Sequence, residues 1–161
     1  MVRPGLLCYG YWPNGQSDPS GEIAPCLSLK SKVSYFKVVA AGEGISYGHL
    51  YRTSKQTRVV TVPIGYGDGY SRSLSNLAPL LIRGQRYQIA GAVCMDQFMV
   101  DVGSSEVYVG DEVTLIGAQG AQVIRLEEIA TLSQSITHEV LCALSDRLPR
   151  MYTEMNSKTN F

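Results

Sequence analysis

Apolar and polar positions follow one period over most of the chain and a second period near its end. Three stretches rich in β-branched residues alternate in part between apolar and polar positions: "LSLKSKVSYFKVV" (27–39), "TRVVTVPIG" (57–65) and "DEVTLIG" (111–117). Turn-forming residues separate such stretches at intervals of about 8 to 12 residues. This spacing is typical of an all-β barrel or sandwich. We therefore predict a mainly β chain from about residue 25 to residue 124.

Further strands are predicted where glycine interrupts apolar runs. The stretch "PLLIRGQRYQIAGAVCMDQFMVDVG" (79–103) holds two or three short strands around Gly84, Gly91 and Asp96, and "AQVI" (121–124) adds another. A glycine inside a strand pattern indicates a β-bulge or the close approach of another backbone. Gly91 is therefore a position where we expect either of these features.

The period changes to that of a helix between residues 125 and 150. The stretch "RLEEIATLS" (125–133) predicts one short helix. A second helix is predicted from apolar residues on one helical face, namely Ile136, Val140, Leu141, Leu144 and Leu148. Ser135 is its predicted N-cap, and Pro149 is expected to end it. The fold class predicted here is thus mainly β, with two short helices near the C-terminus.

The two ends of the chain differ in composition from its middle. Residues 1–24 are irregular, and the stretch "YWPNGQSDPSGE" (11–22) gathers Pro, Gly and Asn as a linker does. We interpret residues 1–24 as the end of a preceding unit plus a connection, so that the chain is the back part of a longer protein. Residues 25–155 form the predicted β domain, and the tail "NSKTNF" (156–161) is expected to be disordered.

Composition fits a globular domain and argues against two classes of partner. Hydrophobic residues make up 45% of the chain, which lies in the globular range. Because 14 basic and 14 acidic side chains balance without a basic block, we expect no nucleic-acid partner. No apolar run reaches membrane-spanning length, and the first residues lack the features of a signal peptide. We therefore expect a cytoplasmic protein with no membrane partner.

The cysteines support the same interpretation. Cys8, Cys26, Cys94 and Cys142 are scattered without a Cys-x-x-Cys pair. A zinc site would need paired ligands, so we predict no metal site. We expect reduced and mostly buried thiols, as is usual in the cytoplasm.

Two tyrosines are each followed directly by glycine, Tyr47 before Gly48 and Tyr66 before Gly67. Either these pairs form ordinary turns, or the glycine clears space so that the phenol faces a substrate. The stretch "GYGDGY" (65–70) lacks the spacing of a nucleotide-binding loop. Its Asp-Gly pair favours a tight turn, and taken alone it predicts a hairpin.

Polar residues interrupt a predicted strand at "CMDQ" (94–97). Asp96 is either a buried, hydrogen-bonded carboxylate or an exposed residue at a strand edge. On its own the stretch favours a structural role.

Eight short motifs, in order and at matching spacing, resemble the C-terminal part of alanine racemase, a pyridoxal-phosphate enzyme. They are "VRPGLLCYG" (2–10), "ISYGHLY" (45–51), "GYGDGYSR" (65–72), "SLSN" (73–76), "IRGQR" (82–86), "GAVCMDQFMVDV" (91–102), "GDEVTLIG" (110–117) and "THEV…RLPRMY" (137–152). Each motif alone is weak, but the eight together are highly specific. The resemblance covers nearly the whole chain except the linker and the last residues.

The resemblance implies a two-part architecture. An N-terminal (β/α)₈ barrel holds pyridoxal 5'-phosphate, and a β-barrel domain follows it. This chain would begin in the last segment of that barrel, at residues 1–24. The lysine that forms the Schiff base would lie in the preceding barrel, so we expect the 161-residue chain alone to be inactive. The family also implies a homodimer whose active sites are shared between subunits.

The resemblance assigns a role to each candidate residue of the substrate site. Tyr47 matches the catalytic tyrosine, which acts as the base on one face of the substrate Cα while lysine serves the other face. The ordinary pKa of a tyrosine is about 10, so cationic neighbours and fixed hydrogen bonds must favour the phenolate. Tyr66 matches the tyrosine at the site entrance. Met95 matches the residue whose backbone contacts the substrate carboxylate, and Asp96 lies beside it.

The resemblance also assigns cofactor contacts. Arg3 matches the arginine that donates to the pyridine nitrogen, although a mobile terminal residue is the alternative in this chain. Gly5 and Leu6 match positions whose backbone N–H groups hold the phosphate. His138 stands where the family usually has a tyrosine that contacts the phosphate. It either replaces that contact or is a first-turn helix residue facing solvent.

The function implied is interconversion of L- and D-alanine by a two-base mechanism, which supplies D-alanine for peptidoglycan. The alternative of a different class is a non-catalytic β-barrel module for interaction or dimerisation. One departure from the family pattern is Gly67, where alanine is common.

Overall fold

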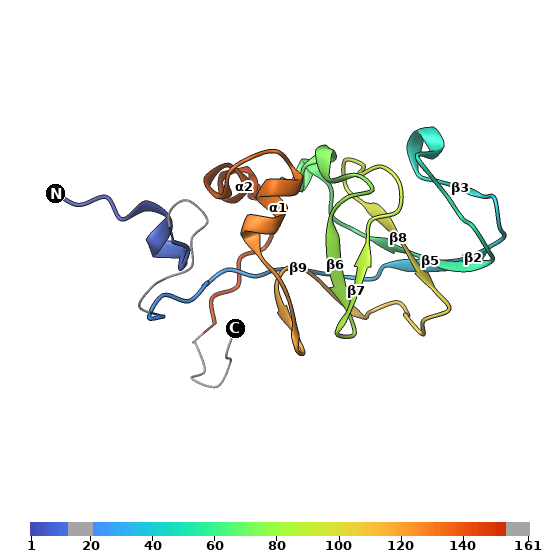
Figure 1. Ribbon diagram of the computed structural model, residues 1–161, viewed down its shortest axis with the longest axis horizontal. Coiled ribbons are helices and arrows are strands. Elements are labelled where there is room, and N and C mark those ends of the chain that lie inside the picture. Colours follow the sequence, from blue (N-terminus) through green and yellow to red (C-terminus); the bar gives the residue numbers. More distant parts are fainter. Residues whose placement is uncertain (13–20, 154–161) are drawn as a thin grey trace.

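The structure is a computed structural model that describes residues 1–12 and 21–153. Figure 1 shows an elongated molecule in which the N-terminal segment and the β3 region lie at opposite ends. Part of the expected linker (13–20) and the whole of the expected disordered tail (156–161) lie outside the described residues. Among the described residues, no helix is long and apolar enough to cross a bilayer.

The largest sheet has five antiparallel strands. Its order is β1 (Leu29–Lys32), β9 (Glu112–Gln119), β6 (Pro79–Ile82) and β7 (Gln85–Gln88), with β10 (Gln122–Ile124) also paired to β9. All four side chains of β6 are buried, because β6 lies between β7 and β9 at the centre of the core. The apolar run of β6 is therefore explained by burial on both of its faces.

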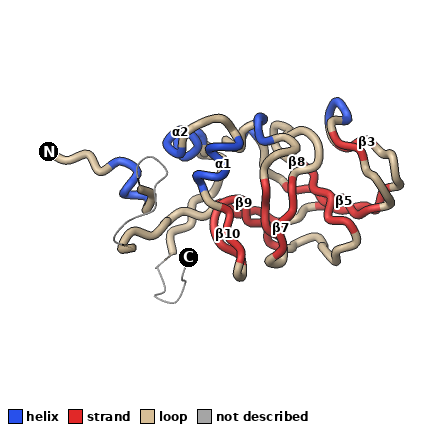
Figure 2. Tube along the Cα trace, viewed as in Figure 1, coloured by secondary structure: helices blue, strands red, loops and turns tan. Residues whose placement is uncertain are grey.

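A second sheet has three antiparallel strands in the order β2 (Tyr35–Val39), β5 (Thr57–Val62) and β8 (Phe98–Gly103). β8 alternates strictly, with Phe98, Val100 and Val102 buried and the intervening side chains half-buried, as a strand with one covered face does. A third, small sheet pairs β3 (Gly44–Ile45) with β4 (Tyr51–Arg52). Figure 2 shows this strand ribbon at the edge of the fold. The described strand pairs form three sheets and do not by themselves trace a closed barrel.

The mainly β prediction with two C-terminal helices is confirmed. The helices are α1 (Leu126–Leu132) and α2 (Thr137–Ala143), and both lie on one side of the sheets in Figure 1. Val140, Leu141, Leu144 and Leu148 pack against the core as predicted. Ile136, however, is 63% exposed.

Both predicted boundaries of the second helix are wrong. Ile136 is the N-cap residue, and Ser135 instead donates a side-chain hydrogen bond to the Glu139 carboxylate. The helix ends at Ala143, well before Pro149. It ends there because Leu144 turns extended (ψ 112°) and the chain docks on residues 68–69, where the Ser145 N–H donates to the Asp68 carbonyl at 3.1 Å.

Short 3-10 helices connect the strands and carry several predicted site residues. They are η1 (Gly5–Tyr9), η3 (Tyr47–His49), η4 (Tyr66–Asp68) and η5 (Arg72–Leu74). The hairpin predicted for residues 65–70 is wrong, because η4 connects β5 to β6, two strands that lie in different sheets. The expectation of mostly buried thiols is also wrong, since Cys94 is buried while Cys8, Cys26 and Cys142 are exposed.

Candidate active site

Tyr47 stands on a tight loop between β3 and β4 (Figure 1). Ser46 (φ 62°), Gly48 (φ 70°) and His49 (φ 48°) all have a positive φ, which is uncommon for residues other than glycine. Three such residues around one tyrosine turn the chain sharply and present the phenol outward. Tyr47 is 76% exposed.

Side-chain hydrogen bonds fasten this loop to its neighbours. At its start, the Ser46 hydroxyl donates to the Ala92 carbonyl at 2.9 Å. At its end, the Asn76 side-chain amide donates to the Leu50 carbonyl at 2.9 Å. The Tyr51 hydroxyl then donates to the Asp101 carboxylate at 2.7 Å. Burial, followed by this hydrogen bond to Asp101, raises the pKa of Tyr51 to about 12.

Tyr66 and Met95 lie on two loops that touch backbone to backbone. The Tyr66 N–H donates to the Cys94 carbonyl at 3.0 Å, and the Gly67 N–H donates to the Met95 carbonyl at 2.8 Å. Both side chains remain accessible, Tyr66 at 44% and Met95 at 57%. The Met95 N–H donates to no other residue in the described part of the chain. The structure therefore brings these two predicted residues together with a free backbone donor between them.

Asp96 is exposed, which excludes the buried carboxylate among its two earlier interpretations, and it lies in a bend just before β8. The buried carboxylate of this region is instead Asp68, which is only 7% exposed. Asp68 accepts from the Gly65 N–H at 2.9 Å and lies 3.3 Å from the Arg147 side chain. Sequence reasoning took Asp68 for a turn residue and missed this link, because Arg147 comes from the far end of the chain.

The two glycines after the tyrosines are needed for different reasons. A Cβ on Gly48 would lie 3.8 Å from its nearest neighbour, the Leu50 side chain, so its φ of 70° and not crowding explains the glycine. A Cβ on Gly67 would lie 2.9 Å from the Met95 carbonyl oxygen and 2.7 Å from an Arg147 nitrogen. Close packing within the chain therefore accounts for Gly67.

The predicted cofactor residues lie away from the Tyr47 loop. Arg3 and Gly5 are exposed in the N-terminal segment, and Leu6 is buried. The Gly5 and Leu6 N–H groups donate to no other described residue. His138 is exposed in the first turn of α2. Because η1 and the Tyr47 loop occupy opposite ends of the molecule (Figure 1), one chain does not bring all the candidates into one site.

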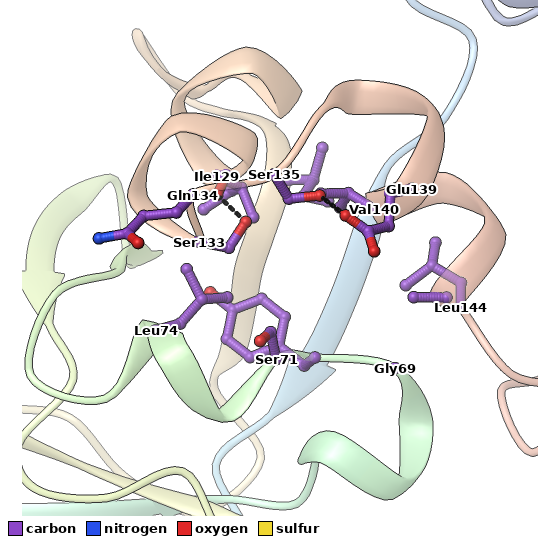
Figure 3. A pocket seen from close by; sticks show the side chains of 13 residues that line it. Gly69, Ser71, Leu74, Ile129, Ser133, Gln134, Ser135, Glu139, Val140 and Leu144 are labelled. Carbon is purple, nitrogen blue, oxygen red and sulfur yellow. Dashed lines mark hydrogen bonds between the residues drawn. The ribbon is translucent and has the colours of Figure 1, made fainter.

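A cavity that the sequence did not indicate lies between η5 and the two helices (Figure 3). Its volume is about 340 Å³, and its lining includes Leu74, Ile129, Ser133, Glu139 and Val140. Figure 3 shows two of the polar groups engaged, Ser133 with the Ile129 carbonyl and Ser135 with the Glu139 carboxylate. None of the predicted site residues lines this cavity.

The strands and helices define a mainly β domain with two C-terminal helices. Two of its loops expose a tyrosine. The family model described as "Alanine racemase, C-terminal domain" matches residues 26–152. The chain therefore belongs to the alanine racemase C-terminal domain family, as the resemblance predicted.

Named relatives and solved structures agree with this assignment. Alanine racemase from Halothermothrix orenii is 45% identical over 153 residues, covering 94% of this chain and 40% of the relative. Alanine racemase from Carboxydothermus hydrogenoformans is 48% identical over 156 residues, covering 94% and 42%. This chain thus spans about 40% of the length of the curated relatives it matches.

The similarity extends to three-dimensional structure. The crystal structure of alanine racemase from Bacillus anthracis with bound L-Ala-P matches with a TM-score of 0.87 at 40% identity, covering 93% of this chain and 39% of that one. Alanine racemase from Streptomyces coelicolor A3(2) matches with a TM-score of 0.89 at 33% identity, covering 96% and 41%. The similar structures thus carry the same fold within a longer chain.

Proposed function

We propose that this chain is the C-terminal part of a pyridoxal-phosphate-dependent alanine racemase that interconverts L- and D-alanine. Membership of the alanine racemase C-terminal domain family carries the proposal. Its product, D-alanine, would serve peptidoglycan synthesis in the cytoplasm. The exposed phenol of Tyr47, held on a fastened loop, supports the role of a base that meets substrate bound outside this chain.

The residues present fit a cofactor that carries a phosphate group. The Gly5 and Leu6 N–H groups are free of described partners, and successive free N–H groups suit an anion. The exposed His138 can add a donor, and Arg3 would donate to the pyridine nitrogen. Bound pyridoxal phosphate would supply an electron sink for negative charge at the substrate Cα. Arginine beside the ring cannot protonate it, which favours proton exchange at Cα over further reaction.

The chain's own residues would handle the substrate as follows. Tyr47 would exchange a proton with Cα on one face of the substrate. The free Met95 N–H would donate to the substrate carboxylate, with Asp96 beside it. Tyr66, whose loop is bonded to that of Met95, would limit the width of the entrance. The Met95 N–H would thus hold the substrate carboxylate while Tyr47 removes the proton from Cα.

We also propose that the active site is completed by a second subunit. The Tyr47 loop and the η1 segment lie at opposite ends of this chain. A site that needs both must therefore draw them from two copies. A homodimer in which each site takes Tyr47 from the neighbouring subunit meets this requirement.

A chimera tests the proposal. This chain would replace the matching part of the Halothermothrix orenii alanine racemase, to which it is 45% identical, so that the relative supplies the barrel. We expect the chimera with pyridoxal phosphate to convert L-alanine to D-alanine, and Tyr47→Phe to lower kcat by about 10²- to 10⁴-fold, the range for loss of a general base. D-alanine would be measured by a coupled oxidase assay.

The matched control is Tyr35→Phe, which removes the hydroxyl of another exposed tyrosine on β2 and should leave kcat unchanged. A chimera that folds and dimerises but makes no D-alanine would contradict the catalytic proposal and favour a non-catalytic dimerisation module. Equal activity in Tyr47→Phe and Tyr35→Phe would contradict the role of Tyr47.

A further inference from the structure

We infer that Asn76 is a positioning residue that holds the Tyr47 loop and the Met95 loop in fixed relation. The effect of Asn76 on catalysis rests on the proposed function. Its effect on the position of the Tyr47 loop does not depend on that function. Asn76 follows η5 and belongs to neither loop. Nothing in its sequence context, the motif "SLSN", indicates a chemical role by itself.

The contacts of Asn76 join three segments. Its side-chain nitrogen donates to the Leu50 carbonyl at 2.9 Å, where the Tyr47 loop ends. Its side-chain oxygen accepts from the Gly91 N–H, where the segment toward Met95 begins. Its own N–H donates to the Gly91 carbonyl at 3.1 Å. One side chain thus uses its donor on one loop and its acceptor on the other.

The backbone of Asn76 is shaped for this task. Its φ is 57°, in the left-handed region that asparagine enters more readily than most residues. The Gln88 side-chain amide donates to the Asn76 carbonyl, which ties the residue to the large sheet. The preceding residue acts similarly, since the Ser75 hydroxyl accepts from the Val93 N–H at 3.0 Å.

The two loops joined by Asn76 also touch each other. A Cβ on Gly91 would lie 2.7 Å from the Ile45 carbonyl oxygen and 2.7 Å from the Ser46 Cβ. The Gly91 backbone therefore lies directly against the start of the Tyr47 loop, which is the second of the two alternatives predicted for this glycine. Contact at the start of the loop comes from Gly91 and Ala92, and the Asn76 amide fixes its end.

Fixing both ends matters because Tyr47 has little packing of its own, being 76% exposed. A base must lie within hydrogen-bond reach of the proton it takes, and misplacement by about 1 Å can cost about 10²-fold in rate. If the Leu50 end were released, Tyr47 would sample positions away from the substrate held by Met95. The loss would fall on kcat more than on KM, because the Met95 loop keeps its backbone bonds to residues 66–67.

Two variants separate the two bonds of the side chain. Asn76→Gly tolerates the left-handed φ and removes both side-chain bonds. Asn76→Asp keeps the acceptor for the Gly91 N–H but places an oxygen against the Leu50 carbonyl. Gln134→Gly is the matched control, because Gln134 also has a positive φ (56°) and its side chain makes no hydrogen bond to the described residues.

The first readout is hydrogen exchange in the 161-residue chain, which requires no activity. We expect the hydrogen-bonded amides within residues 47–52, among them that of His49, to exchange about ten-fold faster or more in both Asn76 variants, and those of residues 91–94 to do so only in Asn76→Gly. Gln134→Gly should leave both segments unchanged. Unchanged exchange at residues 47–52 in folded Asn76→Gly would overturn the inference, whatever the fate of the proposed function.

The second readout is kinetics in the chimera. We expect Asn76→Asp to lower kcat by about 10- to 100-fold with less than a three-fold change in KM, while Gln134→Gly keeps wild-type values. Wild-type kcat in Asn76→Asp, with faster exchange at residues 47–52, would overturn the catalytic part of the inference. An inactive parent chimera would count against the proposed function and leave the exchange result standing.

Discussion

Tyr47 and Tyr66 are each followed by glycine, yet supports of opposite kinds carry them. Tyr47 projects from a small two-stranded ribbon, and side chains of Ser46 and Asn76 hold its loop. Tyr66 sits on a turn whose backbone is bonded to the Cys94 and Met95 carbonyls, and the same turn carries the buried Asp68. The first arrangement holds the phenol on a projecting loop. The second holds it on a turn whose backbone is bonded to a neighbouring loop.

This difference agrees with the two roles that we propose, a base for Tyr47 and a residue at the site entrance for Tyr66. A base that must reach into a neighbouring subunit has to project, and its position then depends on a few directional bonds. A residue that narrows an entrance has to be rigid, and backbone bonds with close packing provide rigidity. The same dipeptide therefore meets two structural demands.

The sharpest test of the comparison asks whether Tyr47 works in the neighbouring subunit. In the chimera, one protomer would carry Tyr47→Phe and a second would carry a replacement of the barrel lysine. Each homodimer lacks one base at both sites and should be nearly inactive. Random re-pairing of equal amounts makes about half of the dimers mixed, each with one intact site of two, so about a quarter of wild-type activity should return.

The measurement is racemisation after co-refolding, with mass spectrometry to show the heterodimers. If Tyr47 acted within its own subunit, every pocket would carry one defect. If heterodimers form but racemisation does not recover, the site is not shared between subunits. The projecting position of Tyr47 would then need another explanation.

A second test compares the glycines of the two regions. Gly69, after the Tyr66 turn, has a φ of 97°, and a Cβ there would lie 2.0 Å from the Ala143 carbonyl oxygen. We expect Gly69→Ala to lower the free energy of unfolding by about 3 kcal/mol, since overpacking adds to left-handed strain. Gly48→Ala, with its nearest neighbour at 3.8 Å, should cost only about 1 kcal/mol of strain.

Urea unfolding of the two variants and the parent chain would measure both values. Equal losses would mean that strain alone explains both glycines. They would also mean that the chain after α2 does not pack tightly against residue 69.

The sequence pattern predicted those parts of the fold that depend on local periodicity. Partial alternation in residues 27–39 predicted β1 and β2, and the helical spacing predicted that Val140 and Leu144 would pack against the core. At Gly91, where a β-bulge or a close backbone approach was predicted, the structure shows the close approach. These features are encoded within a few residues of one another.

The supports of the candidate site were not predictable in the same way. Asp68 pairs with Arg147 and Asn76 joins Leu50 to Gly91, and each link spans segments distant in sequence. The end of α2 was misplaced for the same reason, because docking on residues 68–69 ends the helix before Pro149 does. Roles for Tyr47, Tyr66 and Met95 came from family resemblance and remain predictions.

A third tyrosine gives the test with the smallest expected effect. Tyr70 comes after Gly69 and is not followed by glycine; it points inward, 2% exposed, and stacks on Phe98 with ring centroids 5.7 Å apart. Its hydroxyl has no hydrogen-bond partner among the described residues. An unpartnered buried hydroxyl costs free energy, so we expect Tyr70→Phe to be neutral or to stabilise the chain by about 1 kcal/mol at pH 7.

Alkaline pH should enlarge this difference. Burial raises the pKa of Tyr70 above the ordinary value, with a smaller contribution from the Glu128 charge. The folded state therefore holds the phenolic proton more tightly than the unfolded state, whose pKa stays near about 10. The contribution of Tyr70 to stability is complete below that pH and falls as pH rises through it, by up to about 1.4 kcal/mol per pH unit. Tyr70→Phe removes this loss, so its advantage should grow between pH 9.5 and 11 in urea unfolding.

Tyr51→Phe is the contrasting variant, because Tyr51 has both a raised pKa of about 12 and a partner in Asp101 at 2.7 Å. Tyr51→Phe should lower the free energy of unfolding by about 1.5 kcal/mol at pH 7, since a hydrogen bond to a charged group is broken. This deficit should shrink only above about pH 10, for the same linkage reason. The two Tyr→Phe variants should therefore differ in unfolding free energy at pH 7. At alkaline pH the stability of both, relative to the parent chain, should rise with pH. A destabilised Tyr70→Phe at pH 7 would show that the inward hydroxyl has a partner, and that Tyr70 is fastened by a specific bond as the Tyr47 loop is.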